Sequence, residues 1–143
     1  MPIAETKRIV IDTSLAISAA ILPNSISAKA FSLALKNFQL VASDSTLAEL
    51  VDVIYRPKFN KYLSDEARLE FLTLYAQSSE IVSVTSVITD CIDPKDNQFL
   101  ALAIDATASF ILSGDPHLID MNPYRGVAIV DPKCFVEKYK KHK

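Results

Sequence analysis

Glycine is almost absent from this sequence. Only Gly114 and Gly126 occur among the 143 residues. A dinucleotide-binding fingerprint needs three glycines in a tight cluster, and a P-loop needs a glycine directly before a lysine. Both motifs are therefore excluded, and with them the nucleotide-cofactor and P-loop classes of protein.

Cysteine, net positive charge and long apolar runs are also lacking. Cys91 and Cys134 have no zinc-ligand spacing, and a single pair makes no disulfide framework, so we expect reduced thiols in a cytoplasmic protein. The formal net charge is −2, so any contact with nucleic acid has to be local or made through metal ions. No apolar run reaches the roughly 18 residues of a membrane span. Residues 1–8 lack the hydrophobic core of a signal peptide.

Short apolar runs alternate with helical patterns along the chain. Runs rich in β-branched residues and closed by turn signals predict strands over residues 8–11, 38–42, 80–84, 109–112 and 127–130. Helices are predicted over residues 25–37, 44–55, 64–77, 96–107 and 132–140. This order predicts a single domain over residues 1–143, of the α/β class. Its mostly parallel central sheet has four to five strands and is flanked by helices.

Four acidic residues from distant positions are predicted to meet at one edge of this sheet. Asp12 and Asp115 directly follow predicted strands. Asp96 opens a helix after a turn, and Glu49 lies in a helix that starts from the same edge. Clustered carboxylates repel one another unless a proton or a cation lies between them, and their hard oxygens select Mg²⁺ or Mn²⁺. A site with two such ions can activate a water and stabilise the leaving oxygen of a phosphodiester.

A purely structural role is the alternative for each acid. Aspartate is a favoured helix N-cap, and Asp12 and Asp115 both lie at strand-to-helix junctions. Two further aspartates at such junctions, Asp44 and Asp131, are interpreted as caps. Glu49 lies about 160° around its helix from the apolar stripe of residues 47–54, a position that suits plain solvent exposure. The residues alone leave both interpretations open.

Four segments carry these acids in a fixed order along the chain. They are Val10-Ile11-Asp12-Thr13-Ser14, residues 43–59 with Arg56-Pro57-Lys58-Phe59 at their end, residues 93–103, and residues 111–118. Together they resemble the PIN-domain ribonucleases over nearly the whole chain, in particular the branch of toxin components from toxin–antitoxin pairs. The resemblance implies a PIN-like three-layer fold and maps the acids of the family to Asp12, Glu49, Asp96 and Asp115.

The resemblance also implies an activity and partners. It implies an endoribonuclease that hydrolyses RNA with Mg²⁺ or Mn²⁺, forms a homodimer and acts as a toxin beside a cognate antitoxin protein. The aspartates would bind the metal ions, and Glu49 would complete the ligand set or act as general base. Arg56 and Lys58 are expected to hold the RNA backbone, with ordinary surface charge as the alternative. His117 stands where this branch usually has an acid, and we interpret it as solvated surface.

Two other functional classes remain open. One is a PIN-like domain that acts as a binding or RNA-processing module and not as a toxin. The other is a phosphoryl-transfer domain of another α/β family. The haloacid-dehalogenase motif of that second class needs a second aspartate two residues after the first, and this chain has Asp12-Thr13-Ser14. Metal-dependent cleavage of RNA distinguishes these classes.

Overall fold

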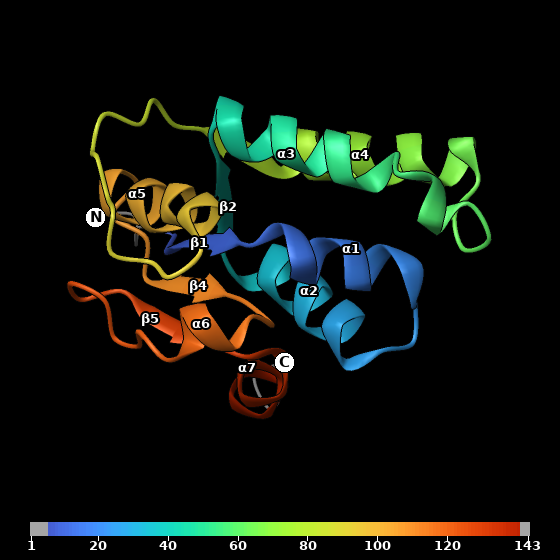
Figure 1. Cartoon of the computed structure of the whole chain (residues 1–143). Helices are drawn as coiled ribbons and strands as arrows, with labels where there is room; N and C mark the ends of the chain where they lie inside the picture. The colour runs from blue at the N-terminus through green and yellow to red at the C-terminus, as the bar shows by residue number, and fades with distance from the viewer. Residues whose placement is uncertain (1–5, 141–143) are drawn as a thin grey trace, which may run out of the picture.

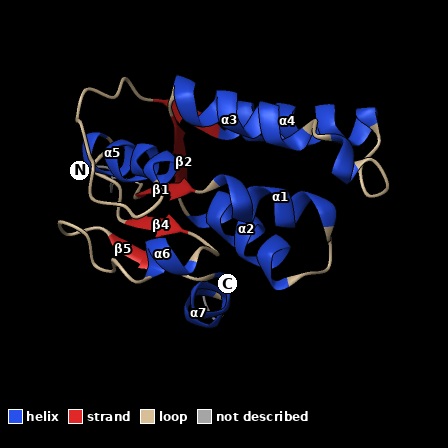
Figure 2. Ribbon diagram, viewed as in Figure 1, coloured by secondary structure: helices blue, strands red, loops and turns tan. Residues whose placement is uncertain are grey.

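The centre of the protein is a parallel sheet of five strands in the order β3-β2-β1-β4-β5 (Figures 1 and 2). The computed structural model describes residues 6–140. The strands are β1 (Arg8–Ile11), β2 (Gln39–Ala42), β3 (Ser79–Ile81), β4 (Phe110–Leu112) and β5 (Ala128–Val130). Each pairs in parallel with its neighbours. The predicted α/β class is confirmed, and the sheet is parallel throughout.

Helices connect the strands. Those of the described range are α1 (Thr13–Ile21), α2 (Ile26–Asn37), α3 (Asp44–Ile54), α4 (Asp65–Ser78), α5 (Asn97–Asp105), α6 (Pro116–Ile119) and α7 (Pro132–Tyr139), with short 3₁₀ helices η1 (Pro57–Phe59) and η2 (Pro94–Asp96). Within residues 6–140, none of these helices has the length and apolar character to cross a bilayer. The predictions for residues 1–5 and 141–143, at the two ends of the expected domain, fall outside the described residues.

Alternate side chains of the central strand enter two separate cores. Ile9 and Ile11 of β1 pack into a core with α1, α2, α3, α4 and α7, whereas Val10 packs into a second core with α5 and α6. All three side chains are almost fully buried. A parallel strand covered by helices on both faces has no solvent-facing side, and this is why residues 9–11 form an unbroken apolar run.

The sequence analysis missed α1 and α6. Helix α1 has the sequence Thr-Ser-Leu-Ala-Ile-Ser-Ala-Ala-Ile, and five of its nine residues are buried. Because α1 is packed on several sides, apolar residues occur all around it and leave no helical period to detect. Helix α6 has only four residues, too few to show a period. Both helices begin directly after predicted site aspartates, Asp12 and Asp115.

Two predicted boundaries are wrong. Strand β3 covers residues 79–81 and not 80–84, because the chain leaves the sheet after the backbone N–H of Val82 donates to the carbonyl of Ala42. Asp44 is the first residue of α3 and not its cap. The Ser43 hydroxyl is the cap and accepts a hydrogen bond from the N–H of Thr46. The predicted cap Asp131 is confirmed at the start of α7.

Candidate metal centre

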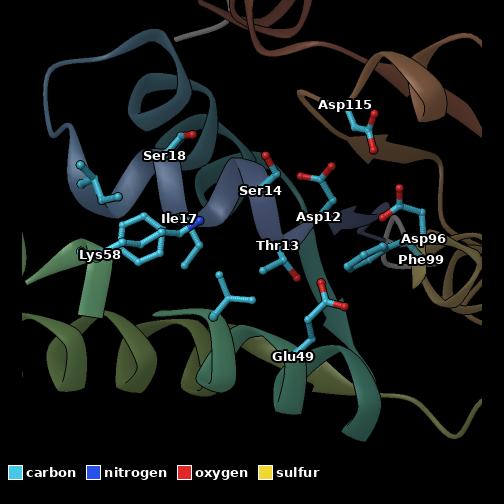
Figure 3. Close-up of a pocket in the computed structure, with 13 residues that line it drawn as sticks. Asp12, Thr13, Ser14, Ile17, Ser18, Glu49, Lys58, Asp96, Phe99 and Asp115 are labelled. Atoms are coloured by element: carbon cyan, nitrogen blue, oxygen red, sulfur yellow. The ribbon is translucent and has the colours of Figure 1, made fainter. Parts of the chain in front are cut away.

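The carboxyl ends of β1 and β4 lie side by side, and all four predicted acids gather there. Asp12 follows β1, and Asp115 lies three residues beyond the end of the adjacent β4. Asp96 reaches the same place from η2, and Glu49 reaches it from α3. All four line one cavity of about 380 Å³, into which Figure 3 shows their carboxylates pointing. The structure therefore brings together the residues that the sequence predicts to converge.

Asp12 is both a helix cap and a cavity residue. Its Oδ1 accepts a hydrogen bond of 2.8 Å from the N–H of Leu15, and its Oδ2 accepts one of 2.5 Å from the Ser113 hydroxyl. Only 3% of the residue is exposed. Burial raises the pKa of Asp12 from 3.8 to about 6, against the lowering effect of these hydrogen bonds, and the charges of Asp115 and Glu49 add to the rise. Asp12 can therefore cap α1 and still belong to a metal site.

Asp96 has an unsatisfied oxygen. Its Oδ2 is buried and has no hydrogen-bond partner among the described residues, and the same holds for Oγ1 of Thr13, which lines the cavity as well. Burial raises the pKa of Asp96, and the neighbouring carboxyl of Asp115 raises it further. A buried carboxylate oxygen without a donor is costly unless a proton or a cation satisfies it.

Asp115 caps α6 while it lines the cavity. Its Oδ1 accepts a hydrogen bond of 2.9 Å from the N–H of His117, and its own N–H donates to the Ser113 hydroxyl at 2.9 Å. The Ser113 hydroxyl, which is fully buried, also donates to Asp12, so one side chain links Asp115 to Asp12. The His117 side chain is exposed and is not part of the cavity lining, in agreement with its interpretation as solvated surface.

Glu49 does not point into bulk solvent. The Gln98 side chain donates a hydrogen bond of 2.6 Å from Nε2 to Oε2 of Glu49 and also contacts the carbonyl of Lys95 at 3.0 Å. The buried face of α3 is rotated relative to the predicted stripe. Leu50 is buried, but Val51, assigned to the stripe, is 45% exposed. This rotation turns Glu49 toward the cavity, in contrast to the solvent-exposed alternative.

The donor set of the cavity fits a hard divalent cation. Apart from the ammonium of Lys58, the polar side-chain atoms of its lining are carboxylate and hydroxyl oxygens, the ligands that Mg²⁺ and Mn²⁺ prefer. The unsatisfied oxygen of Asp96 and the raised pKa values of Asp12 and Asp96 show that negative charge here lacks compensation. Within residues 6–140, no three acidic, histidine or cysteine side chains already surround a common point.

The raised pKa of Asp12 predicts how stability depends on pH. The folded protein binds a proton near pH 6 that the unfolded chain, with a pKa near 3.8, binds only at lower pH. In EDTA, Asp12 alone should therefore lower the free energy of unfolding by about 1 kcal/mol between pH 5 and pH 8, and the raised pKa of Asp96 adds to this fall. Urea unfolding at both pH values measures this difference. Asp12→Asn should reduce it, and equal pH dependence in the two proteins would contradict the assignment.

The predicted basic residues differ in position. Lys58, from η1, lines the cavity (Figure 3). Arg56 does not line it and forms an ion pair of 3.3 Å with Asp52 on the surface of α3. The structure thus favours Lys58 over Arg56 as a contact for a ligand of this cavity. Both cysteines are free, as expected, and Cys91 is buried.

Ser113 and Gln98 are site residues that the sequence analysis did not identify. Each orients one acid by a hydrogen bond, Ser113 to Asp12 and Gln98 to Glu49. Ser113 had a weak signal, because it immediately precedes the Gly114-Asp115 turn. Gln98 had none, since a glutamine in the first turn of a helix is ordinarily a surface residue.

Comparison with known proteins identifies relatives over most of the chain. The family model described as PIN domain matches residues 8–117. The uncharacterized protein MJ1680 of Methanocaldococcus jannaschii is 34% identical over 145 aligned positions, which cover 94% of this chain and 92% of that protein. The matched family region contains all four acids.

Two crystal structures share the fold at low sequence identity. PAE2754 from Pyrobaculum aerophilum has a TM-score of 0.63 and 14% identity, covering 95% of this chain and 91% of its own. VapBC2 from Rickettsia felis, bound to a DNA fragment from its promoter, has a TM-score of 0.58 and 15% identity, covering 87% of this chain and 98% of its own. Identities this low establish the common fold alone.

Proposed function

Because this chain belongs to the PIN domain family, we propose that it is a metal-dependent endoribonuclease. PIN domains are generally nucleases, and they generally use divalent metal ions. The observation that carries the proposal is the buried, unpartnered Oδ2 of Asp96 in a cavity lined by three further carboxylates. Such an arrangement is costly in a protein that binds nothing there, and a cation removes the cost.

The proposed roles follow from the contacts of each residue. Asp12, Asp96 and Asp115 would hold one or two Mg²⁺ or Mn²⁺ ions, with Glu49 completing the ligand set or accepting the proton of the attacking water. Bound ions supply Lewis acidity, which lowers the pKa of water and offsets charge on the phosphodiester. Ser113 and Gln98 hold their respective carboxylates in position. Lys58 attracts the RNA backbone without reading its sequence.

Cleavage of RNA tests this function. A labelled, mixed pool of RNA is incubated with the protein in Mn²⁺, in Mg²⁺ and in EDTA. Internal cleavage is expected with either ion and none in EDTA. Intact RNA under all three conditions, with a folded protein confirmed by circular dichroism, would refute the proposal. Cleavage that persists in EDTA would refute its metal dependence.

We further propose that the protein is the toxin of a toxin–antitoxin pair, acting in the cytoplasm as a homodimer. The support is the similarity of its fold to VapBC2, together with the sequence motifs of the toxin branch. Growth arrest on expression of the wild-type chain, relieved by co-expression of a small gene adjacent to its own, is the expected result. Unimpaired growth would instead favour an RNA-processing role.

Divalent metal ions should raise the melting temperature. Ions between clustered carboxylates bind the folded state only, and a hundredfold excess over the dissociation constant stabilises it by about 2.7 kcal/mol. We therefore expect Mn²⁺ at millimolar concentration to raise Tm by several degrees relative to EDTA, measured by differential scanning fluorimetry. Asp96→Asn should lose most of this shift. Equal Tm values for the wild type in Mn²⁺ and EDTA would count against the metal site.

Replacing Glu49 by glutamine should impair turnover more than RNA binding. The change keeps the size of the side chain and removes the charge that a metal ion or a proton acceptor requires. We expect kcat to fall by about 10²-fold, the effect typical of losing a general base. Single-turnover cleavage gives the rate, and fluorescence anisotropy gives the affinity for RNA, which should change little.

Gln98→Met is the matched variant for this prediction, because it removes the hydrogen bond to Glu49, together with an exposed one to the carbonyl of Lys95, and leaves the Glu49 carboxylate in place. It should lower kcat by a smaller factor. In the double variant, the loss should equal that of Glu49→Gln alone, because Gln98 acts through Glu49. If the Glu49→Gln variant has the kcat of the wild type, the assignment of Glu49 to the site is wrong.

A further inference from the structure

The cavity extends beyond its acids into a groove between α1 and α3. Thr13, Ile17 and Ile21 line it from successive turns of α1, four residues apart and therefore on one face of the helix. Glu49 and Val53 line it in the same way from α3, which packs against α1. The groove thus leads from the carboxylates for about 12 Å along α1. Its lining changes from acidic to apolar in that direction.

The far end of the groove combines an aromatic ring with a positive charge. After α3 ends, η1 places Lys58 and Phe59 in the lining, and Figure 3 shows Lys58 on the side away from Asp96 and Asp115. The Lys58 ammonium lies 5.2 Å from the centre of the Phe59 ring, and Phe59 is half-buried. Aromatic rings beside cations are the usual elements of a site for single-stranded nucleic acid, where bases stack and phosphates are neutralised.

Hydroxyl groups form a second row on α1 beside the apolar one. Ser14 and Ser18 both line the groove and stand one helical turn apart. Each hydroxyl donates and accepts hydrogen bonds. Apolar walls with hydroxyls along one side suit a flat group that has apolar faces and a polar edge.

We propose that this groove binds one unpaired nucleobase of single-stranded RNA, next to the phosphate held at the acids. The inference rests on the proposed ribonuclease function and names the site that holds one base of its substrate. A base has the apolar faces and polar edge that the groove accommodates, and Lys58 neutralises the phosphate that accompanies it. A paired base has to leave its duplex first, at a cost of a few kcal/mol.

An abasic scan tests the proposal. The probes are copies of one cleavable oligoribonucleotide, each with an abasic nucleotide at a different position. Removal of a stacked base should lower kcat/KM by about 10-fold to 100-fold at one position adjacent to the cleavage site. Other positions should change it little. Annealing the oligoribonucleotide to its complement should lower cleavage by at least the same factor.

The chain offers matched variants for the groove. Phe59→Leu removes the ring but keeps an apolar side chain, and Tyr62→Leu is its control. Tyr62 is exposed and carries the same pairing with a lysine, Lys61, at 5.2 Å, but it does not line the groove. Phe59→Leu should lose about 10-fold in kcat/KM and most of its sensitivity to the abasic position. Tyr62→Leu should behave like the wild type.

The outcomes separate this inference from the proposed function. If the unmodified RNA is cleaved but no abasic position changes kcat/KM by more than twofold, the nucleobase site is refuted and the ribonuclease stands. Cleavage of duplex RNA as fast as single-stranded RNA also refutes the nucleobase site. The groove would then bind another ligand, such as a peptide. If no RNA is cleaved, fluorescence anisotropy measures the affinity of the protein for each of the same probes. A weaker complex at one abasic position supports the site, and equal affinities refute it.

Discussion

Replacing Asp12 by asparagine is expected to reduce RNA cleavage by about 10³-fold or more while the fold is retained. Asparagine keeps the size of the side chain and one acceptor oxygen for the N–H of Leu15, so the start of α1 is preserved. It removes the charge that metal ions require, and their Lewis acidity is worth several kcal/mol in a transition state. Initial rates in Mn²⁺, with circular dichroism as the test of folding, measure the loss.

The metal-free Asp12→Asn protein should be at least as stable as the wild type at pH 8. The buried carboxylate has a pKa raised to about 6, so its charged form opposes folding, and the neutral amide does not. Asp96→Asn and Asp115→Asn should give the same pattern, with lost cleavage and an intact fold. Wild-type cleavage in any of the three variants would exclude that residue from the site.

Replacing Arg68 by methionine is expected to lower the free energy of unfolding by about 3 kcal/mol or more. Arg68 lies on α4 and is only 3% exposed. Its Nε donates to the carbonyl of Ile54 at 2.7 Å, and its Nη2 donates to the carbonyl of Arg56 and to Oδ1 of Asn60. Methionine fills much of the volume but leaves the buried carbonyl of Ile54 and two half-buried acceptors without donors, and an unsatisfied buried acceptor costs about 1–3 kcal/mol. Urea denaturation measures the change.

Arg125→Met is the control for this loss. Arg125 is exposed, and its hydrogen bond to Asp90 is on the surface, so its replacement should change the free energy of unfolding by less than about 1 kcal/mol. Because Arg68 ties the end of α3 to the segment that carries Lys58, its loss should also weaken RNA binding. Equal stability of the two variants would contradict the structural role assigned to Arg68.

Much of the fold could be predicted from local sequence patterns. Runs of β-branched residues located all five strands, and the helices predicted over residues 25–37 and 64–77 start at the residues that cap α2 and α4, Ser25 and Ser64. These signals survive because strand propensity and capping depend on neighbours in the chain. The pattern failed at α1, which is buried on several sides and therefore has no polar face to reveal its period.

The candidate site could also be predicted in part. Asp12 and Asp115 follow strands, and in a parallel sheet the ends of adjacent strands meet, so local pattern and topology sufficed to place them. The pattern also allowed each to be only a helix cap. The structure shows both as caps and as cavity residues, because a cap uses only one of the two carboxylate oxygens.

The remaining features depend on contacts between residues far apart in the chain. The Ser113 hydroxyl and Asp12 are 101 residues apart, and Gln98 and Glu49 are 49 apart. The rotation that turns Glu49 inward and leaves Val51 exposed arises where α3 packs on α1. Arg68 is buried because the loop after α3 covers it with backbone carbonyls. Helical period restricts which residues share a face, but only the packing of one element on another selects the face that is buried.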